Sequence, residues 1–351
     1  MKLRGAIVGY GAAAMRVHLP AFLQRAKDRG DLELTAIADV CEERRYLATQ
    51  IAPEARIYTD GEILLESEAE NLDFVDIATP TASHFELVRQ SLEHGLHVLC
   101  ESPLTLSSAE VKELGRLATA RKRVLFPCHY YRYAPAIKAI RDALFEKPMG
   151  EVRGLSLQIL RHGHPLGASE WRPDWRREPR FAGQGIGLEE GGQALALLFD
   201  WASAFPSSVS AKTFNLEAHR YPIEDNLTAT LQFPHGLAQL NLSWTAGANK
   251  LGCTVSTEKG IISVEDDHVR IARLRGDSDS SDWDVERKHV GFTGFESGHA
   301  SWFQSLLVDF ERAVAQEEYE PPQLEAARRA LETIEVAYRS AADNGRELTL
   351  G

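Results

Sequence analysis

The chain contains 351 residues, which at about 150 residues per domain is enough for roughly two domains. Apolar side chains make up 44% of it and charged side chains 26%, a composition that excludes a largely disordered protein. With 51 acidic against 39 basic residues the formal net charge is −12, which argues against nucleic-acid binding, and no apolar run reaches the ~18–20 residues that span a bilayer.

The first 126 residues alternate between short apolar runs and helical patterns. Four apolar runs predict buried parallel strands at residues 3–9, 32–38, 74–78 and 97–100. A helix is predicted over residues 12–29, and two capping boxes, Ser83-x-x-Glu86 and Ser107-x-x-Glu110, predict the starts of two more. This alternation indicates an α/β domain, a Rossmann-type parallel sheet with helices on both faces.

The pattern changes after about residue 126. A helix is predicted at residues 135–145, and apolar residues then alternate strictly over residues 155–159, 227–233 and 238–244. A period of two indicates a mainly antiparallel sheet with one buried face. Helices at about 301–316 and 323–343 complete the chain, so we predict domains at 1–126 and 127–351, the second of the α+β type.

Neither the acidic nor the cysteine residues form a metal-binding pattern. Asp277, Asp279 and Asp282 lie in a Ser/Asp-rich stretch that lacks the glycine and glutamate of a calcium loop, so a solvated hairpin tip is predicted there. The cysteines are scattered without a Cys-x-x-Cys pair, which favours reduced thiols: Cys41, Cys100, Cys128 and Cys253. We expect no metal and, because the first residues show no signal-peptide pattern, a cytoplasmic protein.

A dinucleotide site is predicted where the first strand meets the first helix. The segment from Gly9 to Ala14 fits Gly-x-Gly-x-x-Gly/Ala, with Gly9 for the turn, Gly11 for approach to a pyrophosphate, and Ala12 and Ala13 at the helix start. Asp39 ends the second strand, where a carboxylate binds the ribose hydroxyls of NAD and repels a 2′-phosphate. A plain glycine-rich turn and a helix-capping Asp39 are the alternatives, and Arg44 and Arg45 nearby leave NADP open as the less favoured cofactor.

Beyond this turn, the sequence resembles the Gfo/Idh/MocA family over nearly its whole length. Seven further segments match in order: His18-Leu-Pro20, 73–81 with His84, 94–104, Tyr131-Arg-Tyr-x-Pro135, Glu224-Asp225, Lys259-Gly260 and 338–341. The resemblance implies two domains, the second with a large open sheet, and oxidoreductase chemistry with NAD. It also places Thr79, Pro80, His84, Glu101 and Ser102 at the cofactor.

The catalytic positions of the family differ in this chain. The family's Glu-Lys-Pro segment is Glu101-Ser102-Pro103, so its lysine is replaced by a serine that carries no charge. Aligned on the glycines of residues 183–193, Glu189 stands for the family's Asp and Gln193 for its His. Gln193 cannot titrate, whereas Glu189 can act as an acid or base and lies four residues away, on the same face if the segment is helical. The alternative is that Glu189 only favours a helix N-terminus.

Other polar residues are candidates for the site. Tyr131 lies beside the family's substrate-facing segment and is a possible proton donor, and Arg132 a possible substrate ligand. The segment 171–177 is dense in Trp and Arg, which suit stacking on a sugar and binding of a carboxylate or phosphate. Trp171, Arg172 and Arg176 are therefore predicted to bind substrate, against the alternative of a loop pinned by ion pairs and packed aromatic rings.

Three functions are compatible with these residues. The favoured one is an NAD-dependent oxidoreductase of a sugar, polyol or related hydroxy compound, with Glu189, Tyr131 and Gln193 at the catalytic centre. A redox-inactive NAD-binding regulatory protein would also keep the cofactor residues and lose the catalytic ones. The third is an NAD-using glycosidase or lyase without net redox change. A homodimer or homotetramer through the second domain's sheet is expected, because such a sheet leaves one face uncovered.

Overall fold

The computed structural model describes residues 2–146, 149–275, 283–291 and 299–351. The chain divides into two compact units. The first comprises Met1–Tyr130, Pro165–Gly183 and Gly298–Arg328, and the second comprises Tyr131–His164, Gln184–Ser297 and Arg329–Gly351. Two later segments thus join the N-terminal part, an arrangement that the continuous division at residue 126 did not include. The predicted hairpin tip falls mostly on residues 276–282, outside the described residues.

The first unit contains a six-stranded parallel sheet in the order β3-β2-β1-β4-β5-β6. Its strands are β1 (Leu3–Val8), β2 (Leu32–Ala38), β3 (Arg56–Tyr58), β4 (Phe74–Ile77), β5 (His97–Cys100) and β6 (Leu125–Pro127). The strand order reverses between β1 and β4, and ligands of such sheets bind outside the carboxyl ends of the strands at that point. The predicted Gly9 turn, Asp39, Thr79 and Glu101 all follow strands at this edge.

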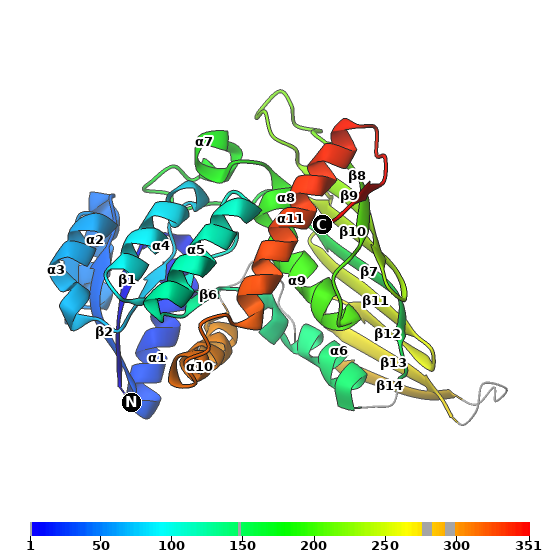
Figure 1. Ribbon diagram of the computed structural model, residues 1–351, viewed down its shortest axis with the longest axis horizontal. Helices are drawn as coiled ribbons and strands as arrows, with labels where there is room; N and C mark the ends of the chain where they lie inside the picture. The colour runs from blue at the N-terminus through cyan, green and yellow to red at the C-terminus, as the bar shows by residue number, and fades with distance from the viewer. Residues whose placement is uncertain (1, 147–148, 276–282, 292–298) are drawn as a thin grey trace. The chain divides into compact units, whose positions relative to one another are not determined.

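Helices cover this sheet, as the strand–helix alternation predicted. They are α1 (Leu19–Arg29), α2 (Glu42–Ile51), α3 (Gly61–Glu68), α4 (His84–Glu93), α5 (Ser108–Arg121) and the later α10 (Ala300–Ala315) (Figure 1). A cluster of buried phenylalanines joins α1 and α10 to the strands: Phe22, Phe74, Phe126, Phe303 and Phe310. Helix α10 is therefore part of the hydrophobic core of the first unit.

Of the two predicted capping boxes, the one at Ser107 forms in part and the one at Ser83 does not form. The Ser107 hydroxyl accepts from the Glu110 amide at 3.3 Å, although the Glu110 carboxylate reaches Leu106 rather than Ser107. The prediction of a capping box at Ser83 is therefore wrong. A 3-10 turn (Thr81–Ser83) leads directly into α4, and the Ser83 hydroxyl bonds to Thr79 and the Pro80 carbonyl instead.

The second unit is built on a nine-stranded sheet in the order β14-β13-β12-β11-β7-β10-β9-β8-β15. The strands are β7 (Val152–Leu160), β8 (Ser208–Phe214), β9 (Asn226–Phe233), β10 (Gly236–Ser243), β11 (Lys250–Thr257), β12 (Gly260–Glu265), β13 (His268–Leu274), β14 (Trp283–His289) and β15 (Leu348–Thr349). Only β7 and β10 pair in parallel; the other neighbours are antiparallel. The predicted mainly antiparallel sheet is confirmed.

One face of this sheet is apolar because of the period-two pattern. Leu157, Leu231 and Leu240 on the three adjacent strands are each at most 2% exposed, whereas their neighbours in sequence point to the other face. The helices α6 (Pro135–Glu146) and α9 (Gly191–Ala202) pack on the apolar face (Figure 1). The short α8 (Ile186–Glu189) precedes α9, and α11 (Pro322–Ala342) follows α10.

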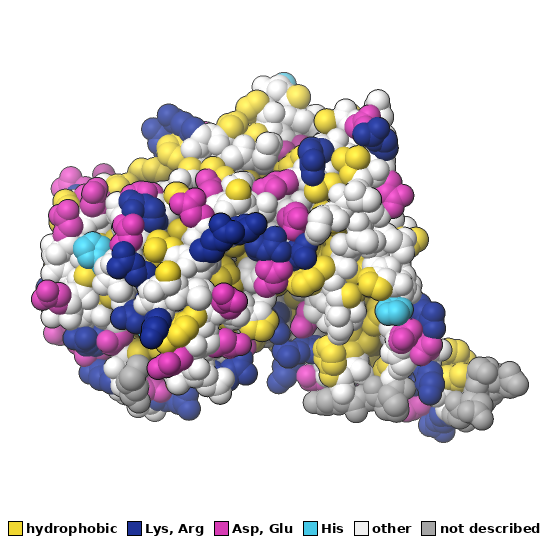
Figure 2. Space-filling view, viewed as in Figure 1, with side chains coloured by type: hydrophobic (Ala, Val, Ile, Leu, Met, Phe, Trp, Pro, Cys, Tyr) yellow, Lys and Arg dark blue, Asp and Glu magenta, His cyan; other side chains and the backbone are white. Residues whose placement is uncertain are grey.

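Charged side chains of both signs are mixed on the surface in view (Figure 2). Figure 2 shows Lys and Arg side chains interspersed with Asp and Glu over the face in view, not gathered into one basic area. No helix in the described part of the chain is both long and apolar enough to cross a bilayer. All four cysteines are buried, and none is in a disulfide.

Candidate active site

The two glycines of the first turn are required for different reasons. Gly9 has a φ of +93°, and a Cβ there would lie 2.8 Å from the Ala78 carbonyl carbon and from Thr79. The chain itself therefore demands glycine at position 9. A Cβ at Gly11 would meet no protein atom within 4 Å. The space in front of Gly11 fits the close approach of a pyrophosphate, so the residues present fit a dinucleotide.

The start of the first helical segment is open to a ligand in the same way. Ala12 and Ala13 are half-buried, and a π-helical turn (Ala14–His18) follows them and leads into α1. The Met15 amide is already bonded to the Gly11 carbonyl at 3.0 Å. The amides before it belong to a helix N-terminus, the position at which free N–H groups favour phosphate.

Asp39 is held rigidly at the end of β2. Its two carboxylate oxygens accept from the Tyr10 amide at 2.7 Å and the Cys41 amide at 2.8 Å. These bonds orient the carboxylate beside the Gly9 turn, where the Rossmann fold places the ribose of NAD.

The two nearby arginines bind main-chain carbonyls. Arg44 is 2% exposed, donates to the Tyr10 carbonyl at 2.7 Å and stacks over the Tyr10 ring at 5.1 Å. Arg45 donates to the carbonyls of Asp39 and Val40 at 2.9 and 3.0 Å. Both guanidinium groups thus brace the loop around Asp39, which favours NAD over NADP.

We predict that Asp39→Ala weakens NAD binding by about 10- to 100-fold, because hydrogen bonds to a charged group contribute a binding free energy of that size. The same substitution should also reduce the ratio of NAD affinity to NADP affinity. Calorimetric titration with both dinucleotides measures this. Glu42→Ala, on the exposed first turn of α2, is the matched control. Unchanged affinity for both dinucleotides in Asp39→Ala would remove Asp39 from the site.

The loops after β4 and β5 are joined by His84. This side chain is 1% exposed, and its ring nitrogens lie 2.8 Å from the Thr79 carbonyl and 3.0 Å from the Pro103 carbonyl. Burial lowers the pKa of His84, which keeps it neutral near pH 7. His84, predicted as a cofactor ligand, is therefore placed to brace the loops that carry Thr79 and Ser102. Thr79 and Pro80 themselves are half-buried.

The hydroxyl group of Ser102 is available to donate a hydrogen bond to a ligand. Its Oγ is buried and has no hydrogen-bond partner among the described residues, while its amide donates to the Glu101 carboxylate at 2.9 Å. A buried hydroxyl without a partner is costly unless a ligand satisfies it. This is a second observation that the first unit fits a bound cofactor.

In the second unit four buried polar side chains meet. Arg161 Nε lies 2.7 Å from Glu190 Oε1, and Arg161 also donates to the Tyr131 hydroxyl at 3.1 Å. The Tyr131 hydroxyl lies 3.3 Å from Glu190 Oε2, and the Tyr131 amide donates to Gln193 Oε1 at 3.3 Å. Tyr131, Arg161, Glu190 and Gln193 are each at most 7% exposed. We call these four residues the Tyr131 cluster.

The cluster contains Tyr131 and Gln193, together with Glu190, the residue that follows the predicted Glu189. The one-face argument for Glu189 and Gln193 assumed a continuous helix, and the structure breaks it: α8 ends at Glu189 and α9 begins at Gly191. Glu190, between them, turns inward, whereas Glu189 is half-buried. Sequence reasoning missed Arg161 and Glu190. A basic residue directly after an alternating apolar strand was the one available signal for Arg161.

Glu224 fixes the glycine-rich segment that leads into this cluster. Its carboxylate accepts from the amides of Gly185 and Gly187, both at 3.0 Å, and from the Tyr338 hydroxyl at 2.6 Å. A Cβ on Gly185 would lie 1.9 Å from the Glu224 carbonyl oxygen. The backbone of this segment therefore needs glycine because of its close contact with Glu224.

The predicted substrate residues have mainly local contacts. Arg132 lies 3.6 Å from Asp200 in the second unit. In the first unit Trp171 packs edge-to-face on Phe181, Arg172 stacks over both rings, and Arg176 stacks over Trp175 at 4.3 Å. These are the contacts of the packed-loop alternative, so binding of substrate by these four residues stays a prediction.

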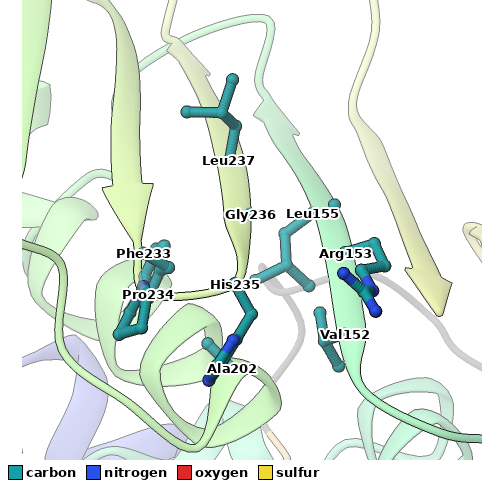
Figure 3. A pocket seen from close by; sticks show the side chains of 10 residues that line it. Val152, Arg153, Leu155, Ala202, Phe233, Pro234, His235, Gly236 and Leu237 are labelled. Carbon is teal, nitrogen blue, oxygen red and sulfur yellow. The ribbon is translucent and has the colours of Figure 1, made fainter. Parts of the chain in front are cut away.

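Two further features of the second unit contain none of these residues. A hollow at the start of β7 is lined by 152–155, Ala202 and 233–237 (Figure 3), without a converging set of buried polar groups. Asp267, His268 and His289 could hold a metal ion, but the Asp267 carboxylate already pairs with both imidazoles, and both histidines are exposed.

Comparison with known proteins identifies the family. Residues 3–129 match the Gfo/Idh/MocA model for "oxidoreductase family, NAD-binding Rossmann fold", and residues 147–350 match the model for its C-terminal alpha/beta domain. The chain belongs to the Gfo/Idh/MocA family of NAD-dependent oxidoreductases. The predicted family, fold class, enzyme class and cofactor are thereby confirmed.

Individual relatives are distant. D-glucoside 3-dehydrogenase of Escherichia coli is 27% identical over 254 residues, 67% of this chain and 68% of that protein. An uncharacterized oxidoreductase of Bacillus subtilis, YfiI, is 25% identical, with 72% of this chain and 66% of the relative aligned. An inositol dehydrogenase homolog from Azotobacter vinelandii, solved with NAD+, has a TM-score of 0.81 at 22% identity and covers 99% of this chain and 97% of its own. The structural likeness establishes the shared fold.

Proposed function

We propose that this protein transfers a hydride between NAD and a hydroxyl-bearing carbon of a sugar or polyol. The observation that carries the proposal is the Tyr131 cluster, a buried acid–hydroxyl–guanidinium group in a member of a dehydrogenase family. The names of D-glucoside 3-dehydrogenase and the inositol dehydrogenase homolog support the substrate class.

The cofactor is held by the first unit. The amides of the Gly9 turn would bind its pyrophosphate, Asp39 its adenosine ribose, and Ser102 Oγ would donate to it. When bound, NAD supplies the hydride acceptor.

The Tyr131 cluster would handle the proton. As the substrate hydroxyl loses its proton to the Tyr131 oxygen, the Tyr131 proton passes to Glu190 Oε2, 3.3 Å away. Arg161 contacts the Tyr131 oxygen and the other carboxylate oxygen of Glu190, Oε1, and so stabilises the negative charge as it moves between the two side chains. Gln193, which cannot titrate, fixes the Tyr131 main chain.

Turnover with a panel of sugars, polyols and sugar acids, followed through NADH absorbance, tests the proposal. We predict that Tyr131→Phe lowers kcat about 100-fold, the lower end of the range for a general acid–base group, and leaves NAD affinity unchanged. Near-normal kcat in Tyr131→Phe would exclude the proton route. Stabilisation by NAD without any turnover would instead identify a redox-inactive binding protein, and turnover without net change in NAD a lyase or glycosidase.

We further propose a cytoplasmic homo-oligomer whose copies meet on the sheet of the second unit. The face opposite α6 and α9 presents polar residues together with Leu237, which is 51% exposed. The buried, unoxidised cysteines suit a reducing compartment. Light scattering coupled to size exclusion measures the assembly, and a monomeric mass at micromolar concentration would contradict it.

A further inference from the structure

His18 occupies a position in the first unit that the proposed function leaves unused. It ends the π-helical turn before α1, and its side chain is fully buried. Nδ1 lies 2.7 Å from Asp76 Oδ2 on β4, and Nε2 lies 2.9 Å from Glu101 Oε1 directly after β5. The ring stacks on Phe303 of α10 at 4.1 Å between centroids. His18 thus joins the helix start after the Gly9 turn to the ends of two strands.

The two negatively charged partners of His18 and its raised pKa together indicate its protonation state. A neutral imidazole donates from only one nitrogen, whereas both nitrogens of His18 face carboxylates. Burial alone lowers the pKa of His18, but Asp76 and Glu101 outweigh it and raise the pKa to about 10. His18 is therefore an imidazolium at neutral pH.

The other titratable groups around it do not change charge near neutral pH. Burial raises the pKa of Cys100 on β5 and of Cys128 after β6, so both are thiols. His84 of α4 is neutral because burial lowers its pKa. Helix α10 contributes the Phe303 ring to His18. The charges that meet at His18 are thus its own and those of Asp76 and Glu101.

Glu101 transmits this arrangement to the cofactor loop. One oxygen of its carboxylate accepts from His18, and the other accepts from the Ser102 amide at 2.9 Å. Asp76 Oδ1 has no partner among the described residues, so the imidazolium is the main support of that carboxylate. Without His18, two buried carboxylates would face each other with no cation between them. At least one of them would move or take up a proton.

We propose that His18 is a positioning residue of the cofactor site, an imidazolium that holds Glu101, and through it Ser102, in the arrangement that binds NAD. This inference rests on the proposed function only in that NAD binds the first unit; it requires no turnover.

The test compares His18→Gln with Phe303→Leu. Phe303→Leu removes the ring that stacks on His18 but leaves both carboxylate contacts of His18 in place. It therefore serves as a control for the loss of packing that His18→Gln also causes. NAD affinity is measured by calorimetry from about pH 6 to 9, the interval below the His18 pKa. The wild-type protein is expected to bind NAD with nearly constant affinity over this interval.

His18→Gln should bind NAD at least tenfold more weakly at the alkaline end and recover part of the affinity as the pH falls. The sign follows from the buried carboxylates: the proton that one of them takes up at lower pH replaces the lost positive charge. Phe303→Leu should melt at a lower temperature yet keep a flat pH profile. A flat profile for His18→Gln, at any affinity, would overturn the proposal.

A second measurement needs only the wild-type protein. With 15N-labelled histidine, NMR near pH 9 should show one doubly protonated imidazole among the 12 histidines of the chain. If every imidazole is neutral, the inference fails even if His18→Gln does not fold. If the imidazolium is present but NAD does not bind the wild-type protein, the proposed function fails instead.

Discussion

Glu190→Gln is expected to lower kcat by about 10³- to 10⁴-fold and the free energy of unfolding by about 3 kcal/mol. The first effect follows from the loss of the proton acceptor next to the Tyr131 hydroxyl. The second arises because Arg161, 4% exposed, would lose the carboxylate of Glu190 from a buried ion pair. Steady-state kinetics and denaturant unfolding measure the two effects separately.

Two comparisons make this result specific. Glu258→Gln breaks the exposed ion pair with Arg153 and should change stability by less than about 1 kcal/mol. Glu189→Gln tests the sequence-based assignment. A larger loss of kcat in Glu189→Gln than in Glu190→Gln would show that the family alignment, and not the buried contact with Tyr131, identifies the acid–base residue.

Local sequence patterns explain why the candidate cofactor-binding residues of the first unit could be predicted. The turn at Gly9 and the carboxylate of Asp39 lie next to strands whose apolar runs are visible in the sequence, and the parallel sheet brings their ends together. The group formed by His18, Asp76 and Glu101 has one signal that is visible in the sequence: Asp76 is a charged residue within the otherwise apolar strand β4. A charge in a buried strand requires a partner, and only the fold shows which residue supplies it.

The Tyr131 cluster was less predictable because its geometry depends on contacts between residues that are distant in the sequence. Glu224 binds the amides of Gly185 and Gly187, 39 and 37 residues away in the chain, and these amides lie just before the break between α8 and α9 at Glu190. A spacing argument cannot detect such a contact. The same reason explains why the sequence pattern does not show that the phenylalanines of helix α10 pack in the first unit.

The contact between Gly185 and Glu224 leads to the prediction with the clearest structural outcome. Gly185→Ala would place a Cβ 1.9 Å from the Glu224 carbonyl oxygen and 2.7 Å from its carboxyl carbon. Neither the main chain of Glu224 nor its carboxylate, bonded to Tyr338, can move without breaking hydrogen bonds. We expect Gly185→Ala to lower the free energy of unfolding by about 3 kcal/mol, the upper end of the range for an overpacked site.

The same substitution should impair catalysis more than cofactor binding. The displaced segment leads directly to Glu190 and Gln193, whereas the residues predicted to hold NAD lie in the other compact unit. We therefore expect kcat to fall at least tenfold while NAD affinity stays within twofold of the wild type. Gly247→Ala is the matched control in the second unit, since a Cβ there meets no atom within 4 Å and its effect should stay within about 0.5 kcal/mol. Equal unfolding midpoints and equal kcat for the two variants would mean that the close contact between Gly185 and Glu224 does not set the position of the Tyr131 cluster.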